Sequence, residues 1–277
     1  MNHLLPAKDR LDLFFKSMPI EAKKSMGQNF LIADHVIEKI ISEVDRKTPK
    51  YLIEIGPGPG ALTDILREKY SDLTLIEFDQ VLAEHWKKQG LPVHEADALN
   101  WDWSQVQDPS ETMLVSNLPF QISSSLVIDR SMDMKPLKTM ILMFQKEVAQ
   151  RIKAKESTEH FGMLSVISQI FWKIDLVCEA GPRDFKPAPQ VASRVLVFQP
   201  RNEFNLTDRP HFLKFVKACF AQRRKLLRKN LDTGWLSIEQ KPIWAKWISE
   251  YQYSENLRAE ELRPEEFVSL YRYLQKG

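Results

Sequence analysis

The sequence predicts an α/β fold in which a mostly parallel β-sheet is covered by helices on both faces and is followed by a smaller C-terminal α-helical domain. Up to about residue 151, short apolar runs alternate with segments of helical periodicity. The first run ends in a glycine-rich loop, and the β pattern stops after residue 200. Alternating strands and helices are typical of parallel sheets, and the remaining stretch indicates a separate helical unit.

The N-terminal residues and the composition predict a cytoplasmic protein. Residues 1–22 are expected to form a loosely ordered leader, and their early charged residues do not fit a signal peptide. No apolar stretch approaches the roughly 18 residues of a membrane span. The two cysteines, Cys178 and Cys219, lie far apart in the chain, which favours a reducing compartment and argues against a zinc site.

A glycine-rich loop, GPGPG at residues 56–60, follows the first predicted strand at residues 51–55 and precedes a helix. Glycines let a backbone approach a ligand closely, and free N–H groups at a helix start favour polar or anionic parts of a nucleotide-like cofactor. A second strand, residues 73–76, ends at Glu77, where a ribose-binding carboxylate is expected. The loop and Glu77 alone would also suit a dinucleotide.

Two further carboxylates favour S-adenosylmethionine over NAD. Glu54 lies in the first strand just before the glycine loop, and Asp97 follows a short strand around Val93. A pyrophosphate close to Glu54 would be repelled. S-adenosylmethionine carries an amine, a ribose and an adenine, so it can use Glu54, Glu77 and Asp97 together.

The tetrapeptide NLPF at residues 117–120 follows an apolar strand at residues 113–115 and suits methylation of a poorly nucleophilic purine amine. The Asn117 side-chain oxygen and the Leu118 carbonyl can accept hydrogen bonds from the amine. Pro119 fixes the loop, and Phe120 offers a stacking face. Such a tetrapeptide also occurs as an ordinary strand-to-loop transition, so the functional interpretation depends on the cofactor motifs beside it.

The later elements follow from the same patterns. Residues 140–144 form an apolar strand, and residues 163–170 have helical spacing. Two strand-like runs, residues 171–178 and 195–198, flank a proline-rich connection and predict an antiparallel pair. From residue 201 onward, helices with polar joints are expected.

The first helix of that helical domain is predicted to continue from an apolar stripe into a run of cations. The cations are Arg223, Arg224, Lys225, Arg228 and Lys229. By itself, such a run is a solvated helix end whose charges complement the helix dipole. The formal net charge of +2 gives no independent indication of nucleic-acid binding. Trp244, Trp247 and Tyr251 recur at helical spacing and are interpreted as a packing stripe.

Taken in order, these motifs resemble the small-subunit (16S) rRNA adenine N6-dimethyltransferase family, KsgA type, over nearly the whole chain. The matching segments are GQNFL at 27–31, EIGPGPGALT at 54–63, IEFD at 76–79, DAL at 97–99, NLPF at 117–120, QKEV at 145–148, an FxPxPxVxS pattern from Phe185 and FxQRRK from Phe220. The resemblance implies a Rossmann-like class I methyltransferase sheet in an S-adenosylmethionine-binding catalytic domain at residues 23–200, and a helical RNA-binding domain at residues 201–277.

The resemblance also implies roles for individual residues. The implied cofactor-binding residues are Asn29, Leu31, Gly56, Glu77, Asp97 and Asn117. The implied catalytic residues are Asn117, Leu118, Pro119, Phe120 and Phe185, with Phe185 stacking a flipped adenine against Phe120. The cations at 223–229 would contact RNA phosphates. One departure is Phe120, because the family most often has Tyr there; stacking survives the change, whereas any role of a phenolic hydroxyl does not.

The expected function is S-adenosylmethionine-dependent dimethylation of N6 of two adjacent adenosines in the 3′-terminal hairpin loop of 16S rRNA, presented on an immature 30S subunit. We expect a monomer that needs neither a metal nor a membrane. One alternative is a 23S rRNA adenine N6-methyltransferase that confers antibiotic resistance. A second is an rRNA-binding assembly factor with secondary methylation. A third, an NAD oxidoreductase, would leave NLPF and the cations unused.

Overall fold

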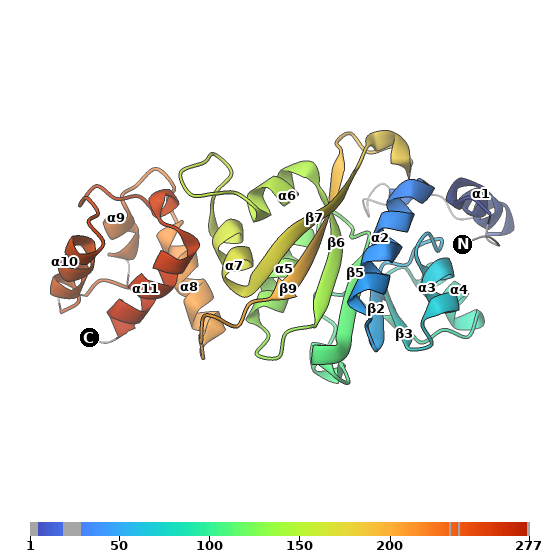
Figure 1. The fold of residues 1–277 in the computed structure, drawn as a ribbon, viewed down its shortest axis with the longest axis horizontal. Coiled ribbons are helices and arrows are strands. Elements are labelled where there is room, and N and C mark those ends of the chain that lie inside the picture. Colours follow the sequence, from blue (N-terminus) through green and yellow to red (C-terminus); the bar gives the residue numbers. More distant parts are fainter. Residues whose placement is uncertain (1–4, 19–28, 233, 238, 276–277) are drawn as a thin grey trace. The chain divides into compact units, whose positions relative to one another are not determined.

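The computed structural model describes residues 5–18, 29–232, 234–237 and 239–275, which form two compact units (Figure 1). The first unit comprises Met1–Arg130, Lys135–Ala149 and Ile174–Pro200. The second comprises Ser131–Met134, Gln150–Lys173 and Arg201–Gly277. The expected boundary at residue 200 therefore omits two segments of the second unit.

A seven-stranded sheet forms the centre of the first unit, in the order β4-β3-β2-β5-β6-β9-β7. Its strands are β2 (Tyr51–Ile55), β3 (Leu73–Glu77), β4 (Val93–Glu95), β5 (Thr112–Ser116), β6 (Thr139–Gln145), β7 (Trp172–Ala180) and β9 (Ser193–Pro200). The strands from β4 to β6 in this order pair in parallel, and β9 pairs antiparallel with β6. The predicted α/β fold with a mostly parallel sheet is confirmed.

The strand order places a ligand crevice between β2 and β5. From β2 the chain continues to β3 and β4 on one side, and then returns to β5 on the other side. Ligands of open parallel sheets bind beyond the carboxyl ends of the strands at such a reversal. The glycine loop follows β2 and Asn117 follows β5, so both motifs lie at this crevice.

Six of the helices that the structure describes lie wholly or partly in the first unit. They are α1 (Ala7–Ser17), α2 (Asp34–Lys47), α3 (Thr63–Lys69), α4 (Gln80–Lys88), α5 (Ser123–Met132) and α6 (Lys146–Ile152), the last two of which extend into segments of the second unit. Helix α2 buries its apolar face in the main core, and the Asp79 carboxylate caps α4 by accepting hydrogen bonds from the N–H groups of Val81 and Leu82. Short 3₁₀ turns lie at Trp103–Gln105, Pro109–Glu111 and Pro182–Asp184.

The prediction of a loosely ordered leader is wrong for α1. Ala7, Leu11 and Phe14 recur on one face of this helix and are buried. Residues at this spacing share a face, so their burial against the sheet domain stabilises the helix. Residues 1–4 and 19–22 of the expected leader lie outside the described residues.

A small two-stranded sheet connects two motifs that are far apart in sequence. Strand β1 (Phe30–Leu31) pairs antiparallel with β8 (Phe185–Lys186). The Ile32 N–H also donates to the Asp184 carbonyl at 2.8 Å. The end of the GQNFL segment and the start of the FxPxPxVxS segment therefore lie side by side.

The second unit is helical around an aromatic core. Its helices are α7 (Met163–Phe171), α8 (Arg209–Cys219), α9 (Leu227–Leu231), α10 (Lys241–Glu250) and α11 (Pro264–Gln275), with a 3₁₀ turn at Ala259–Glu261. The Phe220 and Phe267 rings stack at 5.6 Å, and those of Trp247 and Tyr251 stack at 4.8 Å. Trp244 and Trp247 are buried, which confirms the predicted packing stripe.

Helix α7 belongs to this second unit because its buried face packs there. The Phe171 ring meets the edge of Phe212 in α8 at 6.3 Å. The Gln169 amide donates to the carbonyls of Ile152 and Ala154, so the segment that precedes α7 is hydrogen-bonded to that helix. These contacts link residues far apart in sequence, which is why the sequence pattern placed the boundary later.

The prediction that the cations continue the α8 helix is wrong. Helix α8 ends at Cys219, a turn holds residues 223–225, and Arg228 and Lys229 lie in the separate helix α9. The Asn230 side chain donates to the carbonyls of Cys219 and Gln222 at 2.8 and 3.2 Å, which satisfies the end of α8 as the chain turns back. All five cationic residues are exposed.

In the part of the chain that the structure describes, no helix has both the length and the apolar character needed to cross a membrane.

Candidate active site

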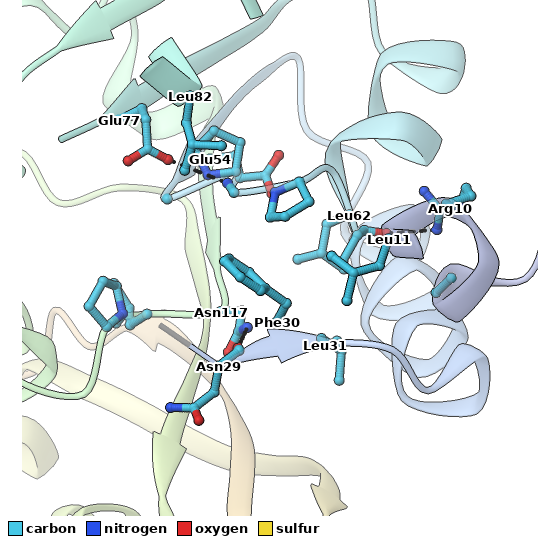
Figure 2. Close-up of a pocket in the computed structure, with 18 of the residues that line it drawn as sticks. Arg10, Leu11, Asn29, Phe30, Leu31, Glu54, Leu62, Glu77, Leu82 and Asn117 are labelled. Carbon is cyan, nitrogen blue, oxygen red and sulfur yellow. Dashed lines mark hydrogen bonds between the residues drawn. The ribbon is translucent and has the colours of Figure 1, made fainter. Parts of the chain in front are cut away.

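A cavity lies at the crevice beyond β2 and β5, and four segments of the first unit line it together with Glu54, Glu77 and Leu82 (Figure 2). The four segments are the glycine loop, the NLPF loop, residues 29–31 and helix α1. The cavity therefore brings together the expected cofactor and catalytic residues except Asp97 and Phe185. The contribution of α1 was missed.

The glycine loop needs its glycines for two separate reasons. Gly60 has a φ of +97°, and a Cβ atom there would lie 2.8 Å from the Trp86 ring. Gly56 has a φ of +64°, and a Cβ there would point at Pro119 Cδ, 3.8 Å away. Left-handed backbone disfavours other residues, and the Trp86 ring leaves no room beside Gly60. A Cβ on Gly56 would make only an ordinary contact with Pro119, so the positive φ is the reason for glycine there, and the NLPF loop runs beside the glycine loop.

We predict that Gly60→Ala destabilises the fold more than Gly90→Ala does. Both glycines have positive φ, but nothing lies within 4 Å of a Cβ at Gly90. The difference in unfolding free energy, measured by urea denaturation, therefore isolates the Trp86 clash and should be about 1–3 kcal/mol. Equal losses in the two variants would contradict this steric account.

Glu77 is a buried carboxylate held in a fixed orientation. It is 6% exposed, and its oxygens accept hydrogen bonds from the Asp79 N–H at 2.8 Å and the Gly58 N–H at 3.4 Å. Burial raises the pKa of Glu77, while these backbone N–H groups act in the opposite direction. An oriented carboxylate at the end of β3 can accept hydrogen bonds from the two hydroxyls of a ribose.

Glu54 lies deeper and lines the same cavity. It is 2% exposed and accepts a hydrogen bond of 2.8 Å from the Thr63 hydroxyl. Burial raises the pKa of Glu54 to about 8, with smaller contributions from the charges of Asp64 and Glu77 in the same direction. Because an isolated buried carboxylate is costly, a cationic ligand in the cavity would favour its ionised form.

Asp97 lies next to Glu77 but is not among the cavity-lining residues. The Ala96 N–H donates to the Glu77 carbonyl at 3.0 Å, which sets the Asp97 turn beside the end of β3. The Asp97 carboxylate accepts hydrogen bonds from the Leu99 N–H and the Asn100 amide, each at 2.9 Å. The nearby Phe78 is 65% exposed, an aromatic surface that sequence reasoning did not single out.

The NLPF loop is braced by its neighbours. The Asn117 amide nitrogen donates to the Asn29 carbonyl at 3.2 Å, which leaves the side-chain oxygen as an acceptor. The Ser123 hydroxyl donates to the Phe120 carbonyl at 2.9 Å, and the Ile122 N–H donates to the Pro119 carbonyl at 3.2 Å. All four loop residues line the cavity.

Phe185 occupies a different place from the one expected. Its side chain is 3% exposed and belongs to the main hydrophobic core, and it is not among the residues that line the cavity. The pairing of β8 with β1 buries it. The sandwich with Phe120 is therefore not formed among the described residues.

Helix α1 supplies three cavity-lining residues that the sequence did not predict, Ala7, Arg10 and Leu11. Phe30 and Leu62, from later segments, also line the cavity. The only local signal for α1 is the spacing of Ala7, Leu11 and Phe14 on one helix face.

The cations of the second unit differ in their surroundings. Arg223 Nε donates to Glu260 Oε2 at 2.8 Å, and its Nη2 donates to the Thr158 carbonyl at 3.3 Å. Part of its charge is therefore compensated within the protein. The predicted contacts of Arg223, Arg224, Lys225, Arg228 and Lys229 with RNA remain predictions.

Comparison with solved structures agrees with the fold. A dimethyladenosine transferase from Plasmodium falciparum superposes with a TM-score of 0.73 at 23% identity, covering 89% of this chain and 98% of that one. The 23S rRNA methyltransferase ErmE gives 0.65 at 21% identity, covering 89% of this chain and all of that one. At these identities, the comparisons establish the fold alone and do not separate the two RNA substrates. They confirm a Rossmann-like methyltransferase fold.

Comparison with sequences is more specific. The profile described as "Ribosomal RNA adenine dimethylase" matches residues 20–276. A "Ribosomal RNA small subunit methyltransferase A" from Bdellovibrio bacteriovorus is 51% identical over 271 residues, 96% of this chain and 97% of the relative. The protein of the same name from Francisella tularensis subsp. novicida is 35% identical over 262 residues, 92% of this chain and 98% of the relative. The chain belongs to the ribosomal RNA adenine dimethylase family.

Proposed function

We propose that this protein uses S-adenosylmethionine to dimethylate N6 of two adjacent adenosines in the 3′-terminal hairpin loop of 16S rRNA during small-subunit biogenesis. The names of the relatives at 51% and 35% identity support the small-subunit substrate. The observation that carries the proposal is that Gly56 and Glu77 line one cavity together with all four residues of the NLPF loop, so the expected acceptor and cofactor motifs face the same space. The proposed setting is an immature 30S subunit in the cytoplasm.

The carboxyl groups at the cavity support S-adenosylmethionine as its ligand. Glu77 is fixed to accept from ribose hydroxyls, and Glu54 is a buried acid whose raised pKa favours a cationic neighbour. Asp97 lies beside Glu77 and would accept a hydrogen bond from the adenine amine. The exposed Phe78 ring offers an apolar face for the adenine. Asn29, Leu31 and Gly56 would contact the rest of the cofactor. The cofactor supplies an electrophilic methyl group on a sulfonium sulfur.

The NLPF loop would hold the target amine for direct transfer. The Asn117 side-chain oxygen and the Leu118 carbonyl accept from the N6–H groups and stabilise the positive charge that develops on nitrogen. Alignment of N6 with the methyl carbon removes much of the entropic barrier. The amine becomes acidic only after attack, so the loop needs no strong base. Phe120 offers its ring to the purine.

The adenine must leave its helical stack to reach this loop, which favours nucleotides that are poorly paired. Dimethylation also requires that the site accept N6-methyladenine for a second transfer. The exposed cations at 223–229 are proposed to hold RNA phosphates, which fixes the register of the RNA without reading its sequence.

The deciding experiment is transfer of labelled methyl groups to under-methylated small subunits and, separately, to large-subunit rRNA. We expect N6,N6-dimethyladenine on the small subunit only, with the label lost in Asn117→Ala. Label on large-subunit RNA alone would show that the protein methylates 23S rRNA instead. No label on either substrate, with RNA binding retained, would favour a binding factor.

A further inference from the structure

Helix α1 is clamped to the glycine loop by a single guanidinium group. Arg10 Nη1 donates to the Gly60 carbonyl at 3.0 Å and to Asp64 Oδ2 at 2.6 Å, and Nη2 donates to the Ala61 carbonyl at 3.2 Å. The side chains of Arg10 and Asp64 are 11% and 18% exposed. A charge-assisted pair this sheltered orders its partners far more than an exposed ion pair does.

Other contacts hold α1 along its length. The Ala7 N–H donates to Asp34 Oδ1 at 3.0 Å, at the start of α2. The Phe14 ring meets His85 of α4 edge-on at 4.9 Å. Helix α1 is therefore attached to α2, α3 and α4 and forms a fixed wall of the cavity.

This wall lies at the end of the cavity remote from Glu77. Figure 2 shows Glu77 on one side and Arg10 with Leu11 on the other, with Phe30 and Leu62 between them. If Glu77 holds the ribose, the adenine extends toward Asp97 and the methyl group toward Asn117. The remaining part of S-adenosylmethionine, its amino-acid chain, then extends toward α1.

We infer that Arg10 is a positioning residue for the amino-acid part of S-adenosylmethionine. This inference rests on the proposed function. Arg10 acts through α1 and through the carbonyl groups of Gly60 and Ala61, whose orientation it fixes, and not by contact with reacting atoms. A planar guanidinium serves these two carbonyls and the Asp64 carboxylate together, whereas a lysine ammonium on its flexible stem lacks the preorganised fork.

The test compares two ligands that differ only in the part facing α1. S-adenosylhomocysteine has the amino-acid chain, and 5′-deoxy-5′-methylthioadenosine lacks it. Their dissociation constants are measured by calorimetry on the full-length wild type, Arg10→Met and Arg10→Lys. Arg67→Met is the matched control, because Arg67 also faces Asp64, at 3.7 Å, but does not line the cavity. Thermal melting checks that each variant is folded.

We expect Arg10→Met to raise the dissociation constant of S-adenosylhomocysteine about tenfold or more, roughly 1.4 kcal/mol. The dissociation constant of methylthioadenosine should rise less than about twofold. The KM for S-adenosylmethionine should rise while kcat at saturation changes little. Arg10→Lys should restore part of the affinity, and Arg67→Met should match the wild type. In wild-type protein, S-adenosylhomocysteine should slow hydrogen exchange of α1 amides more than methylthioadenosine does.

This inference would be overturned if the wild type binds both ligands and Arg10→Met binds both equally more weakly, or binds both as tightly as the wild type does. The proposed function would then remain intact. Wild-type protein that binds neither ligand would overturn the proposed function, and this inference with it.

Discussion

Replacing Asn117 with Ala is expected to lower the rate of methyl transfer by about 10²- to 10³-fold, the usual effect of removing one preorganised group that stabilises charge in a transition state. Asn117 lines the cavity and directs its amide nitrogen to the Asn29 carbonyl at 3.2 Å, which leaves the side-chain oxygen as an acceptor. In the proposed mechanism, that oxygen stabilises a nitrogen that becomes positive only as the methyl group arrives. The loss should therefore appear mainly in the rate constant of methyl transfer measured in a single turnover.

The matched control is Asn202→Ala, the same substitution at an exposed position of the second unit. It should leave the transfer rate unchanged. Loss of the hydrogen bond to Asn29 should cost only about 0.5–1.5 kcal/mol of stability, which thermal melting can verify. A rate within threefold of wild type in folded Asn117→Ala would show that the oxygen is not a significant acceptor.

Much of this site could be predicted because its residues follow buried parallel strands. Such strands are nearly continuous apolar runs, so β2, β3 and β5 are visible as the runs at residues 51–55, 73–76 and 113–115, even with Glu54 in the first. The residue at the end of each strand, or just after it, is then fixed at one edge of the sheet. Gly56, Glu77 and Asn117 needed no long-range information to be placed there.

The parts that were missed depend on contacts between distant residues. Arg10 and Gly60 are 50 positions apart, so nothing local distinguishes Arg10 from an exposed leader cation. Phe185 follows a strand and precedes a proline, as a loop aromatic would, but the pairing of β8 with β1 buries it. The cations looked like one helix because the turn depends on the Asn230 side chain folding back onto α8.

Glu54→Gln is expected to remove a large pH dependence of stability in the cofactor-free protein. Burial raises the pKa of Glu54 from the ordinary 4.5 to about 8, so between these values the folded state keeps a proton that the unfolded state releases. The unfolding free energy of the wild type therefore falls as the pH rises through this window, by about 3–5 kcal/mol from this group. The glutamine side chain of the variant cannot ionise and can still accept a hydrogen bond from Thr63.

Urea denaturation at pH 5, 7 and 8.5 measures this difference, with Glu68→Gln as the control because Glu68 is exposed on α3. Glu54→Gln should gain stability over the wild type as the pH rises, whereas Glu68→Gln should follow the wild type. Parallel profiles for all three proteins would show that Glu54 is not held neutral by burial.

The same carboxyl group should couple cofactor binding to proton release. If S-adenosylmethionine binds in this cavity as proposed, it brings a positive charge that favours ionised Glu54. Binding near pH 7 should then release a proton and tighten as the pH rises toward 8. Calorimetry in buffers of different ionisation enthalpy counts that proton. Glu54→Gln should release none from this site and should lose this pH dependence. The free-energy cost of ionising buried Glu54 in the free protein would then be offset by the positive charge of the bound cofactor.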